Sequence, residues 1–320
     1  MATRVALVLL VLIGLLWLGN SSRLVTGLAD HQTRLIAHRG VHQIYTGTDR
    51  STTSCQASPI APSDHGLIEN TIPSMRAAFA FGADVVELDV HLTSDNVFAV
   101  FHDWTLDCKT DGTGVTHEQS FAELRRLDVG YRYDTGDQSF PLRGTGLGAL
   151  PSLDAVLAAD LPGQYLINFK SRRASDGRAL ATRIADTPDR ARIFGVYGGH
   201  PPTQKAQELL PGLRGFDRPS LKACALRYAL MGWSGYVPQA CRNTLLAVPR
   251  DLAPYLWGWP HRLTRRLGAV GSDVILLGPN DGSGFTTGID SIAAARAVPA
   301  HFDGYVWTNR IDIIGPVFRP

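Results

Sequence analysis

The sequence carries little net charge and no cluster of basic residues. Its 320 residues include 31 Lys and Arg against 29 Asp and Glu, which leaves a formal net charge of +2. No stretch rich in Lys or Arg stands out, although such a stretch is the usual electrostatic footprint of nucleic-acid binding. The composition therefore predicts that the protein has no nucleic-acid partner.

Several binding motifs are also absent. No G-x-G-x-x-G and no G-x-x-x-x-G-K-[ST] follows a candidate strand, which disfavours an open sheet that binds a nucleotide. The four cysteines form no C-x-x-C pair and lie in no histidine cluster with zinc-like spacing. What is present is a chain with 44% hydrophobic residues, long enough to bury a sizeable core.

The first residues differ from the rest of the chain. The basic start MATR precedes residues 5–19, which hold no charge. Fifteen apolar residues are short for a spanning helix, which needs about 17–25, and fit the apolar region of a signal peptide. We expect residues 1–29 to be a signal peptide, with a small-x-small cleavage point at residues 27–29, or an uncleaved anchor that associates the protein with a membrane. Either way, the protein is expected to be exported, to the periplasm, the cell exterior or a membrane.

The even number of cysteines agrees with export, because disulfides persist in oxidising compartments. Four cysteines allow three pairings. We expect Cys55–Cys108 and Cys224–Cys241, because each of these pairs would staple one long irregular segment. Four reduced thiols are the alternative.

Short β-branched or apolar runs alternate with helix-length segments after residue 33, which predicts a parallel sheet with helices outside it. About eight such units in about 290 residues indicate a (β/α)₈ TIM barrel. We expect residues 30–320 to form this single domain, with long loops at 41–68 and 104–150. The expected strands are 34–38, 85–90, 98–103, 165–170, 192–197, 213–217, 244–249, 273–278 and 304–309, and helices are expected at 71–82, 151–159 and 288–298.

Nine candidate strands compete for eight barrel positions, so one of them is wrong or lies outside the barrel. Only seven residues separate the second candidate from the third. A parallel crossover usually needs a dozen or more residues. We therefore expect the barrel to be irregular near its second and third strands.

Polar side chains gather where several expected strands end, which is the face where a barrel builds its site. Residues two apart in a strand share one face, so paired polar residues at a strand end can point inward together. Asp103 is expected to orient His102 or to cap the following turn. The polar residues at these strand ends are His38, Arg39, Glu87, Asp89, His102, Asn168 and Lys170.

This combination of side chains suits chemistry at a phosphate. Two carboxylates suit a hard divalent cation such as Mg²⁺ or Ca²⁺. An arginine and a lysine suit phosphate oxygens. Two histidines can serve as general acid and general base in a displacement at phosphorus, while a metal neutralises developing charge.

The ordered segments AHRG, ENT, GADVVELDV, VFHDWTLD and TDGTG resemble the signature of the glycerophosphodiester phosphodiesterase family. The resemblance covers nearly everything from residue 34 to 159 and thins beyond residue 170. It implies a TIM barrel and metal-dependent hydrolysis of a glycerophosphodiester to glycerol phosphate and an alcohol. The implied substrate is a small phosphodiester or a lysolipid, and the implied cofactor is one divalent cation, Mg²⁺ or Ca²⁺.

The resemblance also assigns roles to single residues. His38 and His102 match the family's acid and base, in an order that the sequence leaves open. Glu69, from ENT, matches a glutamate that is a metal ligand or lies next to the metal. The remaining matches are Arg39 and Lys170 as phosphate contacts, with Glu87 and Asp89 as metal ligands.

At Asn168 the chain departs from the family pattern, which usually has a glutamate there as the third metal ligand. An amide oxygen can still bind Mg²⁺ or Ca²⁺, although the site then holds one negative charge fewer. Glu69 would compensate by entering the metal's coordination sphere. A non-catalytic relative that binds a phosphodiester without turnover is the alternative that this departure raises.

Two further alternatives concern the substrate. The long loops at 41–68 and 104–150 would serve a bulkier lipid phosphodiester, as in lysophospholipase D or sphingomyelinase D relatives. An unrelated glycosidase would use Glu87 and Asp89 as acid and nucleophile. Their spacing disfavours it, because glycosidase carboxylates usually lie about 5–10 Å apart on opposite sides of the scissile bond.

Overall fold

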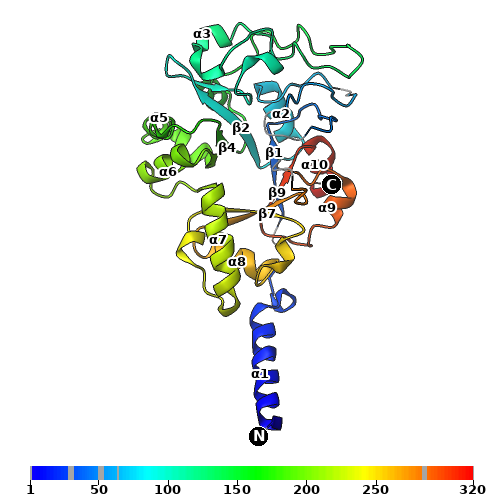
Figure 1. The fold of residues 1–320 in the computed structure, drawn as a ribbon, viewed down its shortest axis with the longest axis vertical. Helices are drawn as coiled ribbons and strands as arrows, with labels where there is room; N and C mark the ends of the chain where they lie inside the picture. The colour runs from blue at the N-terminus through cyan, green and yellow to red at the C-terminus, as the bar shows by residue number, and fades with distance from the viewer. Residues whose placement is uncertain (1, 28–31, 50–53, 63–64, 283–286, 320) are drawn as a thin grey trace.

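The computed structural model describes residues 2–27, 32–49, 54–62, 65–282 and 287–319 (Figure 1). Its strands are β1 (Arg34–His38), β2 (Val85–Leu92), β3 (Phe98–Val100), β4 (Gln164–Phe169), β5 (Ile193–Gly198), β6 (Gly215–Asp217), β7 (Leu245–Pro249), β8 (Asp273–Leu277) and β9 (Tyr305–Thr308). Its α-helices are α1 (Ala2–Asn20), α2 (Ile72–Ala80), α3 (Phe121–Leu124), α4 (Leu153–Ala158), α5 (Ala174–Ile184), α6 (His200–Leu209), α7 (Arg218–Met231), α8 (His261–Gly268), α9 (Ile292–Arg296) and α10 (Ile311–Phe318).

Eight of the strands form a nearly closed parallel barrel in the order β6-β5-β4-β2-β1-β9-β8-β7. Every neighbouring pair on this path runs parallel. Within the described residues, no strand ladder joins β6 to β7. There the hydroxyl of Thr244 donates a 2.7 Å hydrogen bond to the carbonyl of Gly215. The predicted (β/α)₈ barrel is confirmed.

The ninth strand explains the irregularity expected from the sequence. All nine candidate runs form strands, and β3 is the one that lies outside the barrel. It pairs antiparallel with β2, with Val100 opposite Val90. The connection between them is too short to return the chain parallel to β2, so it makes a hairpin instead.

The inside of the barrel is filled by one apolar cluster to which all eight barrel strands contribute. Side chains alternate along a strand. Polar residues two or four positions after a member of this cluster therefore also point into the barrel. His38 follows Ile36 in this way, and Glu87 and Asp89 follow Val85. The cluster consists of Ile36, Val85, Leu166, Phe194, Phe216, Leu245, Ile275, Tyr305 and Trp307.

The long loops at 41–68 and 104–150 pack against each other into a second apolar cluster, here called the cap. Ile60 donates its backbone N–H to the carbonyl of Asp134 at 2.8 Å, which ties the two loops together. The cap core includes Ala57, Ile60, Ile68, Leu106, Val129, Tyr133 and Leu142.

Both expected disulfides are present, and their Cα–Cα distances are 5.4 Å for Cys55–Cys108 and 4.8 Å for Cys224–Cys241. The first bridge joins the two loops of the cap. The second joins α7 to the short helix η6 (Gln239–Cys241). Two disulfides agree with an oxidising, exported environment.

Helix α1 projects from the end of the molecule opposite α3 (Figure 1). Its last residue, Asn20, accepts a 2.9 Å hydrogen bond from Arg266 of α8 and donates one of the same length to the carbonyl of Trp233. Within the described ranges, no helix combines the length and apolar character needed to cross a membrane. Part of the expected cleavage point, residues 28–29, lies outside the described residues.

Candidate active site

Strand β1 ends in a tight turn that brings Arg39 into the mouth of the barrel. Arg39 has φ = 57°, and Gly40 follows with φ = 83°. A Cβ on Gly40 would lie 2.2 Å from the Ser74 hydroxyl oxygen, so only glycine fits this close approach to α2. The guanidinium is thereby buried, with Nη1 3.2 Å from Glu69 and Nε 3.1 Å from Asp89.

Glu87 and Asp89 form a completely buried carboxylate pair on β2. The hydroxyl of Tyr197, on β5, donates a 2.6 Å hydrogen bond to Glu87. Asp89 accepts a 2.8 Å hydrogen bond from the side-chain amide of Asn168, and the ammonium nitrogen of Lys170 lies 3.6 Å away from it. Two polar residues of β4 and its C-terminal end therefore hold one member of the pair.

The two carboxylates differ in their affinity for protons. Burial and then the neighbouring charge of Asp89 raise the pKa of Glu87 to about 8. Burial alone would raise the pKa of Asp89 too, but the cations of Arg39 and Lys170 outweigh it and hold that pKa below its usual range. The pKa values of the two carboxylates are thus shifted in opposite directions, upward for Glu87 and downward for Asp89.

Each of the two predicted histidines has its Nδ1 engaged by a neighbour. Nδ1 of His38 lies 2.6 Å from the amide oxygen of Asn309, and Nδ1 of His102 lies 2.5 Å from Asp103. Asn309 in turn donates a 2.8 Å hydrogen bond to Asp290, which orients its amide. In both rings, Nε2 is left for chemistry at a substrate.

The same histidines are held neutral. Burial first, and the charge of Arg39 second, lower the pKa of both His38 and His102 well below the ordinary value. A neutral imidazole is able to accept a proton near pH 7, as a general base must. Nε2 of His38 also lies 3.8 Å from the Glu87 carboxylate.

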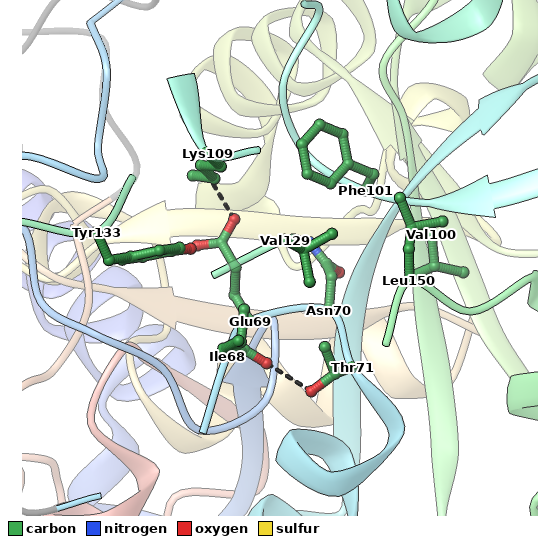
Figure 2. A pocket seen from close by; sticks show the side chains of 10 residues that line it. All are labelled: Ile68, Glu69, Asn70, Thr71, Val100, Phe101, Lys109, Val129, Tyr133 and Leu150. Atoms are coloured by element: carbon green, nitrogen blue, oxygen red, sulfur yellow. Dashed lines mark hydrogen bonds and ion pairs between the residues drawn. The ribbon is translucent and has the colours of Figure 1, made fainter. Parts of the chain in front are cut away.

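Glu69 lies on the other side of Arg39, between two cations. Lys109 places its ammonium 2.7 Å from Glu69 (Figure 2). The same ammonium lies 3.0 Å from Asp103. Although burial opposes it, Arg39 and Lys109 hold the pKa of Glu69 well below its usual range. Glu69 is therefore a charged partner of two cations.

All eight predicted site residues lie in one chain of contacts. It runs from His102 through Asp103, Lys109, Glu69 and Arg39 to Asp89, where Asn168 and Lys170 attach. The backbone N–H of Arg39 donates to the Glu87 carboxylate, which leads on to His38. Residues from β1, β2, β4, the loop before α2 and the 104–150 loop thus meet at one end of the barrel.

The small cavity in Figure 2 is not the substrate site. It measures about 10 Å³ and is lined by residues of the cap and of the loop before α2, including Glu69, Lys109 and Tyr133. A cavity of this size holds about one water molecule. Neither His38 nor His102 lines it.

Four residues of the site were missed by sequence reasoning. Asn309 is the last residue of the last expected strand, so its position was a usable signal. Lys109 and Gln56 lie in loops, and no pattern marks them. Tyr197 lies in an expected strand but reads as an ordinary apolar residue. The four and their partners are Asn309 with His38, Tyr197 with Glu87, Lys109 with Glu69, and Gln56 with Arg39.

The side-chain oxygens of this site match only some of the ligands that a hard cation such as Mg²⁺ prefers. Mg²⁺ is commonly bound through one or two carboxylates together with substrate phosphate and water, and Glu87 with Asp89 supplies such a pair. The side-chain oxygen of Asn168 faces Gly198, where an added Cβ would lie 2.2 Å from it, and the amide nitrogen faces Asp89. In the part of the chain that the structure describes, no three His, Cys, Asp or Glu side chains are grouped to hold a metal ion.

Residues 38–186 match the model of the glycerophosphoryl diester phosphodiesterase family. Over this segment, the chain is similar in sequence to members of that family. The matched segment contains every site residue predicted from the sequence, from His38 to Lys170.

A curated member of the family, glycerophosphodiester phosphodiesterase of Caldanaerobacter subterraneus, is 42% identical over 65 residues, which are 20% of this chain and 27% of that protein. The chain spans 24–38% of the length of the first curated relatives that it matches.

Solved structures of phosphodiesterases extend the likeness over the barrel. Glycerophosphodiester phosphodiesterase from Agrobacterium tumefaciens superposes with a TM-score of 0.57 at 20% identity, covering 90% of this chain and 100% of that one. An Oleispira antarctica phosphodiesterase in complex with the product sn-glycerol-3-phosphate superposes with a TM-score of 0.51 at 18% identity, covering 90% and 98%. At such identities the likeness shows the shared barrel fold.

Proposed function

We propose that the protein is a phosphoric diester hydrolase that cleaves glycerophosphodiesters into glycerol phosphate and an alcohol. The observation that carries this proposal is the contact chain that joins two neutral histidines to Arg39 and a carboxylate pair at one end of the barrel. Sequence similarity to the family supports the reaction, and the product bound to the Oleispira antarctica neighbour supports a small phosphodiester as substrate.

Arg39 and Lys170 would bind the phosphate oxygens. Both are cations that contact Asp89, and Arg39 also lies between the two histidines in the contact chain. An arginine fork and an ammonium are the side chains best suited to phosphate. Their charges also lower the pKa of His102, so a bound phosphate anion would partly offset that effect.

The two histidines would move the protons of the reaction. Nε2 of one ring takes the proton of the attacking oxygen, which belongs to water or to a neighbouring glycerol hydroxyl, as the new P–O bond forms. Attack by the glycerol hydroxyl would give a cyclic phosphate, which a second attack by water opens to glycerol phosphate. The other ring must first take up a second proton, at Nε2, and gives it to the leaving alkoxide as the old P–O bond breaks. Asn309 and Asp103 hold the two rings at Nδ1 throughout.

Glu87 and Asp89 would hold one divalent cation, Mg²⁺ or Ca²⁺. Burial and then the neighbouring charge of Asp89 raise the pKa of Glu87, and a bound cation would favour its charged form. When bound, the metal supplies neutralisation of charge on the phosphate oxygens. Asn168 contacts Asp89, and Glu69 contacts Arg39. That Asn168 or Glu69 also binds the metal is a prediction.

The protein is further proposed to act outside the cytoplasm. Two disulfides and the apolar first segment support export, with residues 1–29 as a signal peptide or an anchor. Protease accessibility in intact cells, read alongside the mass of the mature N-terminus, tests this proposal. A full-length protein found only in the cytoplasm would contradict it.

The test of activity is release of glycerol phosphate or alcohol from a panel of glycerophosphodiesters and lysophospholipids, with Mg²⁺, Ca²⁺ or a chelator. We expect turnover of glycerophosphodiesters that the chelator abolishes. Turnover of lysophospholipids alone would instead identify a lipid phosphodiesterase. Binding without turnover under any metal would identify a non-catalytic phosphodiester-binding relative.

A further inference from the structure

The Cys55–Cys108 bridge is flanked by two residues that both enter the candidate active site. Gln56 follows Cys55, and its side-chain oxygen accepts a 3.0 Å hydrogen bond from Nη1 of Arg39. Lys109 follows Cys108, and its ammonium contacts Glu69 and Asp103. The bridge thus joins the two cap loops at the point where each of them reaches a charged group of the site.

Lys109 is nearly inaccessible, with 1% of its surface exposed. An ammonium buried to this extent is costly unless it is paired. Burial would lower the pKa of Lys109, but Asp103 and Glu69 outweigh it and raise that pKa. The lysine therefore remains charged and is held in place by two carboxylates.

The contact with Asp103 connects Lys109 to the chemistry. The same oxygen, Oδ1 of Asp103, lies 3.0 Å from the ammonium of Lys109 and 2.5 Å from Nδ1 of His102. The partner of one imidazole nitrogen determines which tautomer is present and where the other nitrogen points. A cation that fixes the carboxylate therefore fixes Nε2 of His102.

We propose that Lys109, anchored by the Cys55–Cys108 bridge, is a positioning residue that orients His102 through Asp103. This inference rests on the proposed function, since His102 is taken to be the acid or base of the hydrolysis. Removing the outer partner of a metal-bound histidine typically costs about 10–100-fold in activity, and we expect an effect of the same order for a group that holds His102. Lys109 touches no reacting atom in this role.

The first experiment compares Lys109→Met and Lys109→Arg with the wild type in glycerophosphodiester hydrolysis. We expect Lys109→Met to lower kcat by about 10–100-fold, with a much smaller change in KM, and Lys109→Arg to restore part of the loss. Lys222→Met, which removes an exposed lysine on α7, is the matched control and should keep wild-type kinetics. A wild-type kcat for Lys109→Met would overturn the proposal.

The second experiment removes the anchor and leaves the lysine in place. The double variant Cys55→Ser/Cys108→Ser should lower kcat in the same way, whereas Cys224→Ser/Cys241→Ser should not. This comparison decides the matter if Lys109→Met does not fold. Equal kcat in the two folded double variants would overturn the anchoring role.

A spectroscopic measurement separates this inference from the proposed function. The proton that His102 donates from Nδ1 to Asp103 should give a low-field NMR resonance, identified by its loss in His102→Ala. We expect this resonance to shift or disappear in Lys109→Met, whether or not the wild type hydrolyses any substrate. An unchanged resonance would contradict the proposal, whereas an inactive wild type would contradict only the proposed function.

Discussion

The Cys55–Cys108 bridge lies beside a network of charged groups, while the Cys224–Cys241 bridge lies within the apolar core. Cys224 and Cys241 are both buried among apolar side chains between α7 and η6. The residues that follow Cys55 and Cys108 contact Arg39, Glu69 and Asp103 instead. The same covalent link therefore serves the packing of the barrel in one region and the geometry of its reactive groups in the other.

The largest effect is expected in the charged region, on replacing His102 with alanine. A positioned general acid or base contributes about 10²–10⁴-fold to a rate, so kcat should fall by about that factor. The free energy of unfolding should change little by comparison, because the lost ring is polar and lies at the mouth of the barrel. Steady-state kinetics combined with urea unfolding measure both quantities. Wild-type turnover in this variant would remove His102 from the mechanism.

The two bridges should differ less in stability than in activity. Their cysteines are 53 and 17 residues apart in the sequence. The entropy of loop closure then predicts a loss of roughly 4 and roughly 3 kcal/mol on removing the first and the second bridge. Urea unfolding of the two double serine variants checks these values. If the second bridge affects kcat as strongly as the first, the two regions are not functionally distinct.

The smallest effect is a pH dependence of stability that originates in Glu87. Because its pKa is raised to about 8, the folded protein keeps a proton that the unfolded chain loses above the ordinary value of 4.5. Stability should therefore fall as pH rises toward 8. The lowered pKa values of His38 and His102 act in the opposite direction, but only below their ordinary value of 6.5.

Between about pH 7 and about pH 8, the contribution of Glu87 should thus stand alone, with a slope of at most about 1.4 kcal/mol per pH unit. Urea unfolding in the presence of a chelator, at both ends of this window, measures the slope. We expect Glu87→Gln to abolish it. A slope that is the same in the variant and the wild type would show that another group is responsible.

The fold was predictable because each barrel strand is a short apolar run with clear boundaries. The sequence also placed the irregularity correctly, since seven residues between the second and third runs cannot return a chain in parallel. The position of the odd strand, β3, then follows from its antiparallel pairing with β2. Both disulfide pairings were predicted as well, although the expected reason was wrong: Cys55–Cys108 joins two separate loops, and Cys224–Cys241 joins α7 to η6.

The site was predictable where it is built from strand ends. His38, Glu87 and Asp89 share the inward face of their strands with Ile36 and Val85, so their meeting follows from alternation. The contacts of the cap do not follow from any periodicity.

Lys109 reaches Asp103 only because the loop at 104–150 folds back over the barrel, and Gln56 reaches Arg39 from a different loop. Such contacts depend on the packing of irregular segments, which local sequence patterns do not encode.

The central claim is that the histidine pair cleaves a phosphodiester, and the direct measurement is product release by the purified full chain. Phosphorus NMR would follow a glycerophosphodiester incubated with wild-type protein, with the double variant His38→Ala/His102→Ala, and with wild-type protein plus chelator. The account expects the diester signal to convert to that of a phosphate monoester only in the untreated wild type. A diester signal that persists in all three samples, or that converts equally in the double variant, would contradict it.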